Sequence, residues 1–199
     1  MFKIIPLVTA IACGPAELET SSAKDTQATI VEELPTQFGV ISSEDCSQSQ
    51  PGDTVCNLVL YDQNKEPWQL YDHRNKIVVL DFSTSWCPPC QNAGMFVQPI
   101  QDDYGDELVF ATLLVDGYTP GVEATDDEII DWVESHNITT APVLYASRDL
   151  AFDPTGAGIE GVIISGFPTY IYISKDGILA SGHSGFNEAY VRSIIDRLR

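Results

Sequence analysis

The chain has short apolar runs from about residue 57 to its C-terminus, separated by polar turns and by segments with helical spacing. Two short runs, 57–61 and 68–71, flank the polar turn 62–66 and predict a β-hairpin. The runs 76–82 and 108–115 are almost continuously apolar. Strands buried on both faces have this pattern, so these two runs predict the centre of a sheet that is covered by other elements.

Helical segments alternate with the predicted strands. Apolar residues recur at helical spacing between residues 93 and 104, where Pro99 is expected to kink or shorten the helix. The segment Thr125–Glu128 has the pattern of a capping box and predicts that another helix begins there. The range 138–146 predicts a further extended segment.

The C-terminal part predicts a second hairpin and a final helix. The runs 169–173 and 178–181 flank the turn Lys175–Gly177. The range 190–198 carries its apolar residues on one helical face. Strands that alternate with helices, followed by a hairpin and a helix, indicate the α/β class with a mixed central β-sheet flanked by helices.

The N-terminus carries a short apolar segment. Lys3 precedes the uncharged range 4–12, which ends in small residues before Cys13. This order predicts a secretory signal, because the run is far shorter than the roughly 18 residues of a membrane span. Ala10–Cys13 resembles the bacterial lipobox, whose cysteine becomes the lipidated first residue of the mature chain. The alternatives are an ordinary signal peptide, or a misassigned start on a cytosolic protein with an incidental cysteine.

We therefore expect three regions along the chain. Residues 1–13 form the signal peptide with its lipobox, 14–41 a flexible acidic tether, and 42–199 the folded domain. The tether is rich in Ala, Glu, Ser and Thr and has few large apolar groups, a composition that does not support a packed core. This organisation predicts a protein on the periplasmic side of the bacterial cell envelope, with a lipid anchor as its only membrane contact.

Acidic residues greatly outnumber basic ones. The chain has 29 Asp and Glu against ten Lys and Arg, a net charge of −19. Such a surface repels phosphate backbones, which excludes nucleic-acid binding as the main role, and it excludes a polybasic membrane contact. Between residues 118 and 160 only Arg148 is basic, and this acidic region is either a solvated face or a docking surface for a basic partner.

The five cysteines divide into three groups. If Cys13 carries lipid, four cysteines remain. Two of them, Cys87 and Cys90, form a C-x-x-C pair, which leaves Cys46 and Cys56. These last two bracket a short polar, turn-rich stretch. We expect a structural disulfide between them, and the alternative is two unpaired cysteines. A disulfide that closes so short a loop would stabilise the folded chain by about 2–3 kcal/mol, because it lowers the entropy of the unfolded chain.

The C-x-x-C pair directly follows a predicted buried strand. A cysteine at the start of a helix lies near unpaired backbone N–H groups, which favour the thiolate and lower its pKa. Cys87 is therefore the predicted nucleophile, and Cys90, one helical turn away, is the resolving thiol. Pro88 and Pro89 suit a first helical turn, because an N–H there would be unbonded in any case.

Motifs in the right order along the chain resemble those of a known family. Gly52-Asp53 precedes the first strand, Val79–Phe82 is followed by Trp86–Cys90, and Gly166–Thr169 resembles a cis-proline loop. Together they resemble the thioredoxin fold, and within it the exported TlpA-like and ResA-like thiol-disulfide oxidoreductases. The resemblance implies a thioredoxin fold with an N-terminal β-hairpin extension and an insertion before the cis-Pro loop. Residues 149–161 of the acidic region are the candidate for that insertion, as a loop overlooking the active site.

The resemblance also implies roles for individual residues. Asp81 matches the buried Asp that moves protons to and from the resolving cysteine, and its alternative role is a carboxyl satisfied by a neighbouring hydroxyl. The substrate-binding surface is expected to contain Trp86, Pro88, Pro89, Phe167 and Pro168, with Pro168 as the cis-proline. Expected partners are disulfide- or dithiol-containing exported proteins, together with a membrane redox partner that recycles the dithiol. Reduction of substrates is the expected direction.

The chain departs from the family pattern at several positions. The register of the two central strands places Thr112 beside Asp81, where thioredoxins have a lysine. Ala93 stands where ResA-like proteins have a glutamate, and Met95 stands where the helix proline is usual. The assignment to cytochrome c maturation, which a ResA-like protein would suggest, is therefore weak.

Three other functions compete with this interpretation. Thr84-x-x-Cys87 fits the reactive-cysteine motif of peroxiredoxins, although Leu80 replaces the proline which that motif expects. Copper proteins of the Sco type share the fold but use C-x-x-x-C with a distant histidine. Here only His183 could serve as that histidine, and we expect no metal or other cofactor. A redox-inert binding module is the third alternative, although such a module needs neither Cys87 nor Cys90.

Overall fold

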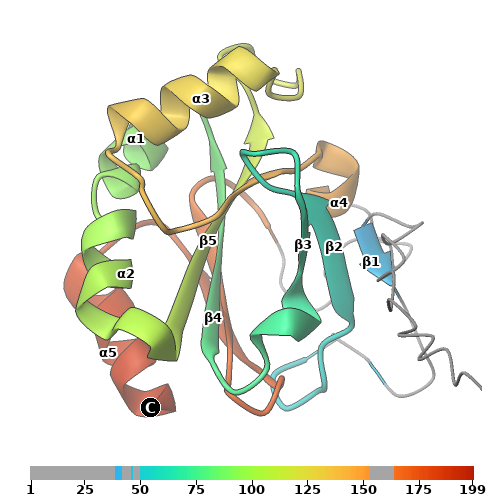
Figure 1. The fold of residues 1–199 in the computed structure, drawn as a ribbon, viewed down its shortest axis with the longest axis vertical. Coiled ribbons are helices and arrows are strands. Elements are labelled where there is room, and N and C mark those ends of the chain that lie inside the picture. Colours follow the sequence, from blue (N-terminus) through green and yellow to red (C-terminus); the bar gives the residue numbers. More distant parts are fainter. Residues whose placement is uncertain (1–38, 42–45, 47–49, 153–163) are drawn as a thin grey trace, which may run out of the picture. The chain divides into compact units, whose positions relative to one another are not determined.

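The computed structural model describes residues 39–41, 46, 50–152 and 164–199 (Figure 1). The expected signal peptide with Cys13, the expected tether up to residue 38, and residues 153–161 of the expected insertion lie outside the described residues. Within the described ranges, no helix combines the length and the apolar character that a bilayer span requires.

A mixed five-stranded sheet forms the centre of the domain, in the order β6-β5-β4-β7-β8. Strand β4 pairs in parallel with β5, which pairs in parallel with β6, while β7 is antiparallel to β4 and to β8. Every residue of β4 and β5 is buried, as their apolar runs predict. The strands are β4 (Ile77–Thr84), β5 (Leu108–Asp116), β6 (Val143–Tyr145), β7 (Thr169–Ile173) and β8 (Leu179–Ser184).

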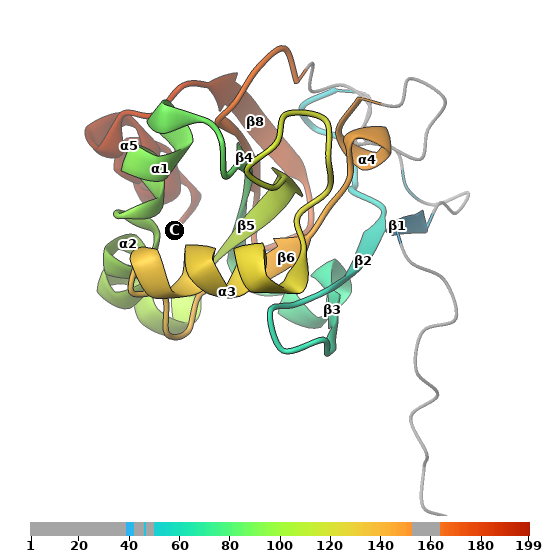
Figure 2. The same ribbon diagram turned by 90° about the horizontal axis from the view of Figure 1, so that it is seen from above.

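Four helices pack on one face of this sheet (Figures 1 and 2). Alternate residues of a strand point to opposite faces, and Ile77 and Val79 of β4 pack with the apolar side chains of these helices. The helices are α1 (Pro88–Gly94), α2 (Val97–Tyr104), α3 (Asp126–Ser135) and α5 (Glu188–Leu198). Thr125 and Glu128 form the predicted capping box at the start of α3.

The opposite face is covered by the N-terminal strands and by two short helices (Figure 1). Val78 and Leu80 of β4 pack there. The covering elements are β1 (Gly39–Ile41), β2 (Asn57–Tyr61), β3 (Pro67–Gln69), the 3₁₀ helix Leu70–His73 and α4 (Arg148–Phe152). The predicted hairpin is thus present as β2 and β3. Strand β1 pairs with β2 on its other edge, so the last three residues of the expected tether, 39–41, form a strand.

The helix after Cys90 is interrupted, as the proline in it predicts. It ends at Gly94 and restarts at Val97, so that Pro99 lies in the first turn of α2. Proline has no N–H for the carbonyl of Met95, four residues earlier, and the continuous helix is lost at that point.

The extended segment predicted for 138–146 is mostly a loop, and only Val143–Tyr145 joins the sheet. The side-chain oxygen of Gln98 accepts hydrogen bonds from the backbone N–H groups of Thr139, Thr140 and Ala141, at 2.8, 3.0 and 3.2 Å. Gln98 is buried, and these three donors are therefore satisfied without a neighbouring strand.

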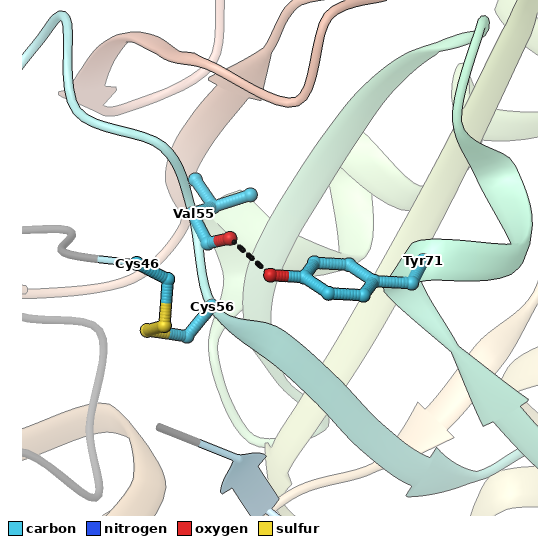
Figure 3. Close-up of a disulfide and its surroundings, with 4 residues drawn as sticks. All are labelled: Cys46, Val55, Cys56 and Tyr71. Carbon is cyan, nitrogen blue, oxygen red and sulfur yellow. Dashed lines mark hydrogen bonds between the residues drawn. A yellow bond between two sulfur atoms is a disulfide. The ribbon is translucent and has the colours of Figure 1, made fainter. Parts of the chain in front are cut away.

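The cysteine pair Cys46 and Cys56 is joined by a disulfide with an S–S distance of 2.05 Å (Figure 3). Beside it, the Tyr71 hydroxyl donates to the carbonyl of Val55 at 2.9 Å. Val55 and Cys56 are buried against the sheet. The covalent link therefore attaches Cys46 to the residue that directly precedes β2.

Helices α1 and α3 approach each other closely at Gly94. His136, directly after α3, is buried, and its two ring nitrogens contact the carbonyls of Trp132 and Gln91 at 2.8 and 3.0 Å. A Cβ on Gly94 would lie 2.6 Å from Cδ2 of the His136 ring. Glycine is needed at position 94 because the imidazole occupies the space of a side chain.

Gly94→Ala should therefore lower the free energy of unfolding by about 1–3 kcal/mol, the usual cost of overpacking. In an unhindered helix the same change would raise stability, so the sign of the effect is diagnostic. Urea denaturation of the single variant, of His136→Ala and of the double variant measures the coupling. Equal costs of Gly94→Ala with and without the imidazole would contradict the steric explanation.

Candidate active site

The C-x-x-C pair lies where β4 ends and α1 begins. Cys87 is the N-cap of α1, with Pro88 and Pro89 in the first two helical positions, and Cys90 lies in the same turn. Both cysteines are reduced and buried. Pro88 and Pro89 are exposed beside Cys87, so they contribute surface next to the thiol.

The second sequence block lies directly against Cys87. The Phe167–Pro168 peptide bond is cis, and the thiol of Cys87 donates to the carbonyl of Phe167 at 3.6 Å. The Thr169 hydroxyl donates to the carbonyl of Gly166 at 2.7 Å and lies 2.8 Å from the Ser184 hydroxyl, which ties this loop to β8. Two segments 80 residues apart in sequence thus form one site.

Asp81 is fully buried in β4 below the dithiol. The Ser83 hydroxyl donates to its Oδ1 at 2.8 Å, while Oδ2 has no hydrogen-bond partner among the described residues. Burial raises the pKa of Asp81 to about 7, although the bond from Ser83 opposes the shift. Asp81 pairs with Thr112 of β5, in the register that the sequence predicts, and the Thr112 hydroxyl also has no partner in the described part of the chain.

Cys90 lies deeper than Cys87 and has no exposed surface. Burial raises the pKa of its thiol far above the ordinary value, and a hydrogen bond with Cys87 and the charge of Asp81 add to that effect. Such a thiol does not ionise by itself at neutral pH.

A second buried carboxylate lies at the end of the neighbouring strand. Asp116, the last residue of β5, accepts the indole N–H of Trp86 at 2.9 Å and the backbone N–H of Gly121 at 2.9 Å. Arg148 binds it through Nε at 2.9 Å and Nη2 at 2.6 Å. Burial alone would raise the pKa of Asp116, but the bonds from Arg148, Gly121 and Trp86 outweigh it and hold the pKa at about 2.

Aromatic rings surround the approach to Cys87. The Phe167 ring makes edge contacts with Trp86 at 6.4 Å and with Phe152 at 5.8 Å, measured between ring centroids. Trp86 is 37% exposed and Phe152 is 42% exposed. We call these three residues, Trp86, Phe152 and Phe167, the aromatic rim.

Sequence reasoning did not identify Asp116, Arg148 or Phe152 as site residues. Asp116 ends an apolar run beside the catalytic strand, and a polar residue in that place was a usable signal. Arg148 is the single cation of an acidic region, which was a second signal. Phe152 carried none, because the local sequence does not show that the short helix α4 folds back onto Phe167.

His183 takes a structural position on the other edge of the sheet. Its Nε2 lies 2.8 Å from the Tyr172 hydroxyl, and its ring lies against Tyr170 and Tyr190. In the described part of the chain, no three or more His, Cys, Asp or Glu side chains lie close enough together to hold a metal ion.

No family model matches the chain, but its sequence is similar to those of thioredoxins and thioredoxin-like proteins. Thioredoxin H2 of Arabidopsis thaliana is 31% identical over 117 residues, which cover 55% of this chain and 74% of that protein. The thioredoxin-like protein YneN of Bacillus subtilis is 23% identical over 136 residues, 68% of this chain and 72% of that protein.

Solved structures of similar fold agree with these relatives. The thiol:disulfide interchange protein of the thioredoxin family from Chlorobium tepidum superposes with a TM-score of 0.59 at 19% identity, covering 76% of this chain and 97% of its own. The exposed lipoprotein thioredoxin of Streptococcus pneumoniae gives a TM-score of 0.58 at 24% identity, covering 71% and 99%. With its reduced C-x-x-C pair at the end of a central strand and facing a cis-proline, the chain belongs to the thioredoxin family of thiol-disulfide oxidoreductases.

Proposed function

We propose that the protein exchanges disulfides with exported proteins through Cys87 and Cys90. The Cys87 thiolate attacks one sulfur of a substrate disulfide, forms a mixed disulfide and releases the other substrate sulfur as a thiolate. Cys90 then loses its proton and attacks the Cys87 sulfur, which releases the reduced substrate and leaves a Cys87–Cys90 disulfide. The substrate gains the two electrons that the dithiol loses.

The position of Cys87 is the observation that carries this proposal. Its sulfur faces the carbonyl of Phe167, next to the cis-proline, while Cys90 lies behind it with no exposed surface. A substrate can therefore approach only the first sulfur. The backbone at Phe167 and Pro168, together with the exposed Trp86, Pro88 and Pro89, would hold the substrate chain beside it.

Asp81 is the proposed base for the second step. The Cys90 thiol has a strongly raised pKa and cannot attack until a base removes its proton. Asp81 has a pKa of about 7 because of its burial, so it can both take up and return a proton near neutral pH. Thr112 supplies no positive charge where thioredoxins have a lysine, which leaves burial as the main determinant of the pKa of Asp81.

The proposed location is the bacterial cell envelope, with Cys13 as the lipid-bearing residue and residues 14–38 as the tether. The Cys46–Cys56 disulfide supports an oxidising compartment outside the cytosol. The likeness to an exposed lipoprotein thioredoxin also supports it. The partners would be exported proteins with disulfides and a membrane redox protein that returns the dithiol to its reduced form.

Reduction of substrates is the proposed direction, and a redox titration of the full chain tests it. Cys87 and Cys90 should form one reversible two-electron couple, with Cys46 and Cys56 oxidised throughout, as measured by mass-tagging of free thiols. A potential near the thioredoxin value of about −270 mV is expected for a reductant. A potential well above about −180 mV would reverse the direction, and the absence of a reversible couple would refute the proposed activity.

Two cysteine variants should separate the steps. Cys87→Ser should abolish exchange, because it removes the attacking sulfur. Cys90→Ser should still attack and should accumulate a mixed disulfide with the substrate, visible as a mass adduct that dithiothreitol removes. Normal multiple turnover by Cys90→Ser would contradict the two-step scheme.

Asp81→Asn should make the protein more stable and less active at the same time. Because the pKa of Asp81 is about 7 in the folded chain and 3.8 in the unfolded chain, the folded state retains a proton that the unfolded state loses. Stability from this group is therefore lost as pH rises from about 4 to 7. The substitution should raise the free energy of unfolding by roughly 2–4 kcal/mol above pH 7 and change it little below pH 4.

The same variant should slow the resolution of a preformed mixed disulfide at pH 7. Urea denaturation across pH and single-turnover kinetics provide the two measurements. A gain in stability without slower resolution would leave Asp81 as a buried group with no catalytic part, and a pH-independent change in stability would contradict its raised pKa.

A further inference from the structure

Helix α4, which belongs to the acidic region of the chain, contacts residues that lie beside the dithiol. Leu150 and Ala151 are buried in the core face that also holds the N-terminal hairpin, and the Ser147 hydroxyl accepts the backbone N–H of Leu150 at 3.2 Å. Arg148 and Phe152, at the two ends of the helix, instead extend toward the site. The helix is therefore anchored by its middle residues and contacts the site through its ends.

The first contact runs from Arg148 through Asp116 to Trp86. The carboxylate of Asp116 has no exposed surface, whereas the side chain of Arg148 is 44% exposed. The guanidinium engages both carboxylate oxygens, which fixes the orientation of the carboxylate. Because the same Oδ2 accepts the indole N–H of Trp86, the guanidinium also restricts the tilt of the indole beside Cys87.

The second contact joins Phe152 to Phe167. The two rings meet edge to face, with their centroids 5.8 Å apart. The carbonyl of Phe167 also accepts the hydrogen bond from the Cys87 thiol. Arg148 lies over the Phe152 ring, 6.0 Å from its centroid, so the two ends of the helix also support each other. Phe152 thereby places an exposed ring beside the residue that faces the reactive sulfur.

We propose that α4 is a substrate-selecting element of the proposed oxidoreductase: Phe152 extends the aromatic rim beside Cys87, and Arg148 positions Trp86 in that rim through Asp116, so that disulfides flanked by aromatic residues are preferred. The inference rests on the proposed function and deepens it. Phe152 is a specificity-determining residue, and Arg148 is a positioning residue.

The chemistry of the rim determines which substrate it favours. When a substrate sulfur reaches Cys87, the residues on either side of the substrate cysteine must lie over the rim. Two of its rings are more than a third exposed, and an aromatic side chain would cover them and gain edge or stacking contacts. A serine in the same place would leave both rings in water and gain neither.

Two matched peptides test the preference. Each carries one intramolecular disulfide, whose cysteines are flanked by Phe in one peptide and by Ser in the other. The pre-reduced full chain should reduce the Phe peptide with a kcat/KM about fivefold higher than that for the Ser peptide. This ratio corresponds to the free energy of one aromatic contact. Hydroxyethyl disulfide, which has no flanking residues to cover the rim, supplies a reference rate.

Phe152→Ala should remove most of that preference: the ratio of kcat/KM for the Phe peptide to kcat/KM for the Ser peptide should fall toward one, mainly through a higher KM for the Phe peptide. Tyr190→Ala, which removes a ring of similar exposure on α5 (49% against 42% for Phe152), is the matched control and should keep the preference. An equal loss on all three substrates, or no loss at all, would overturn the inference. If the unaltered chain reduces none of the three, the proposed function fails instead.

Arg148 is tested by the environment of Trp86. The full chain labelled with 5-fluorotryptophan should give one ¹⁹F resonance for each of its three tryptophans, and Trp86→Phe identifies the one at the site. Arg148→Gln should shift and broaden that resonance and leave those of Trp68 and Trp132 in place, with a reduced preference for the Phe peptide. Arg148→Lys, which keeps the charge but loses the bidentate contact with Asp116, should give a resonance shift and a peptide preference between those of the unaltered chain and Arg148→Gln. A Trp86 resonance and a peptide preference that neither variant changes would overturn the positioning role.

Discussion

Strand β4 lies at the centre of the sheet with both faces covered, and the reactive part of the molecule takes its position from this strand. All eight of its residues are buried, between β5 on one side and β7 on the other. Its first residues make the core, its middle carries Asp81, and its end leads to Cys87. Since a strand held on both edges and both faces cannot shift, the dithiol has a fixed place against the cis-proline loop that precedes β7.

Two buried carboxylates on neighbouring strands, Asp81 in the middle of β4 and Asp116 at the end of β5, have opposite protonation behaviour because their hydrogen-bond partners differ. Asp81 and Asp116 are both fully buried. Among the described residues, Asp81 has only the Ser83 hydroxyl as a hydrogen-bond partner, so desolvation dominates and its pKa rises to about 7. Asp116 has a guanidinium, so its pKa falls to about 2 and it stays ionised. The first group can exchange a proton near neutral pH, while the second is a permanent anchor for Trp86.

Much of the fold was predictable because it depends on local patterns. The buried strands, both hairpins, the capping box at Thr125 and the interruption near Pro99 follow from apolar periodicity and from the hydrogen-bonding capacity of single residues. The extended segment predicted for 138–146 was too long: only Val143–Tyr145 joins the sheet, because the backbone donors of Thr139 and Thr140 bind Gln98, which is about 40 residues away in sequence. Helix α4 was missed because its stability comes from burial of Leu150 and Ala151 against strands that the local sequence does not reveal.

The sequence by itself determined the chemical identity of the site: two sulfurs at C-x-x-C spacing after a buried strand, a carboxyl within that strand and a proline loop far downstream. Spacing and residue type predicted the two sulfurs, because a cysteine pair one helical turn apart can form and break a disulfide. Asp81 and the proline loop were predicted from the resemblance to the thioredoxin fold. Only the tertiary structure decided what surrounds the sulfurs. Asp116, Arg148 and Phe152 reach Trp86 and Phe167 from separate elements, and no local pattern specifies such contacts, since they arise when distant side chains fill the same space around one strand end.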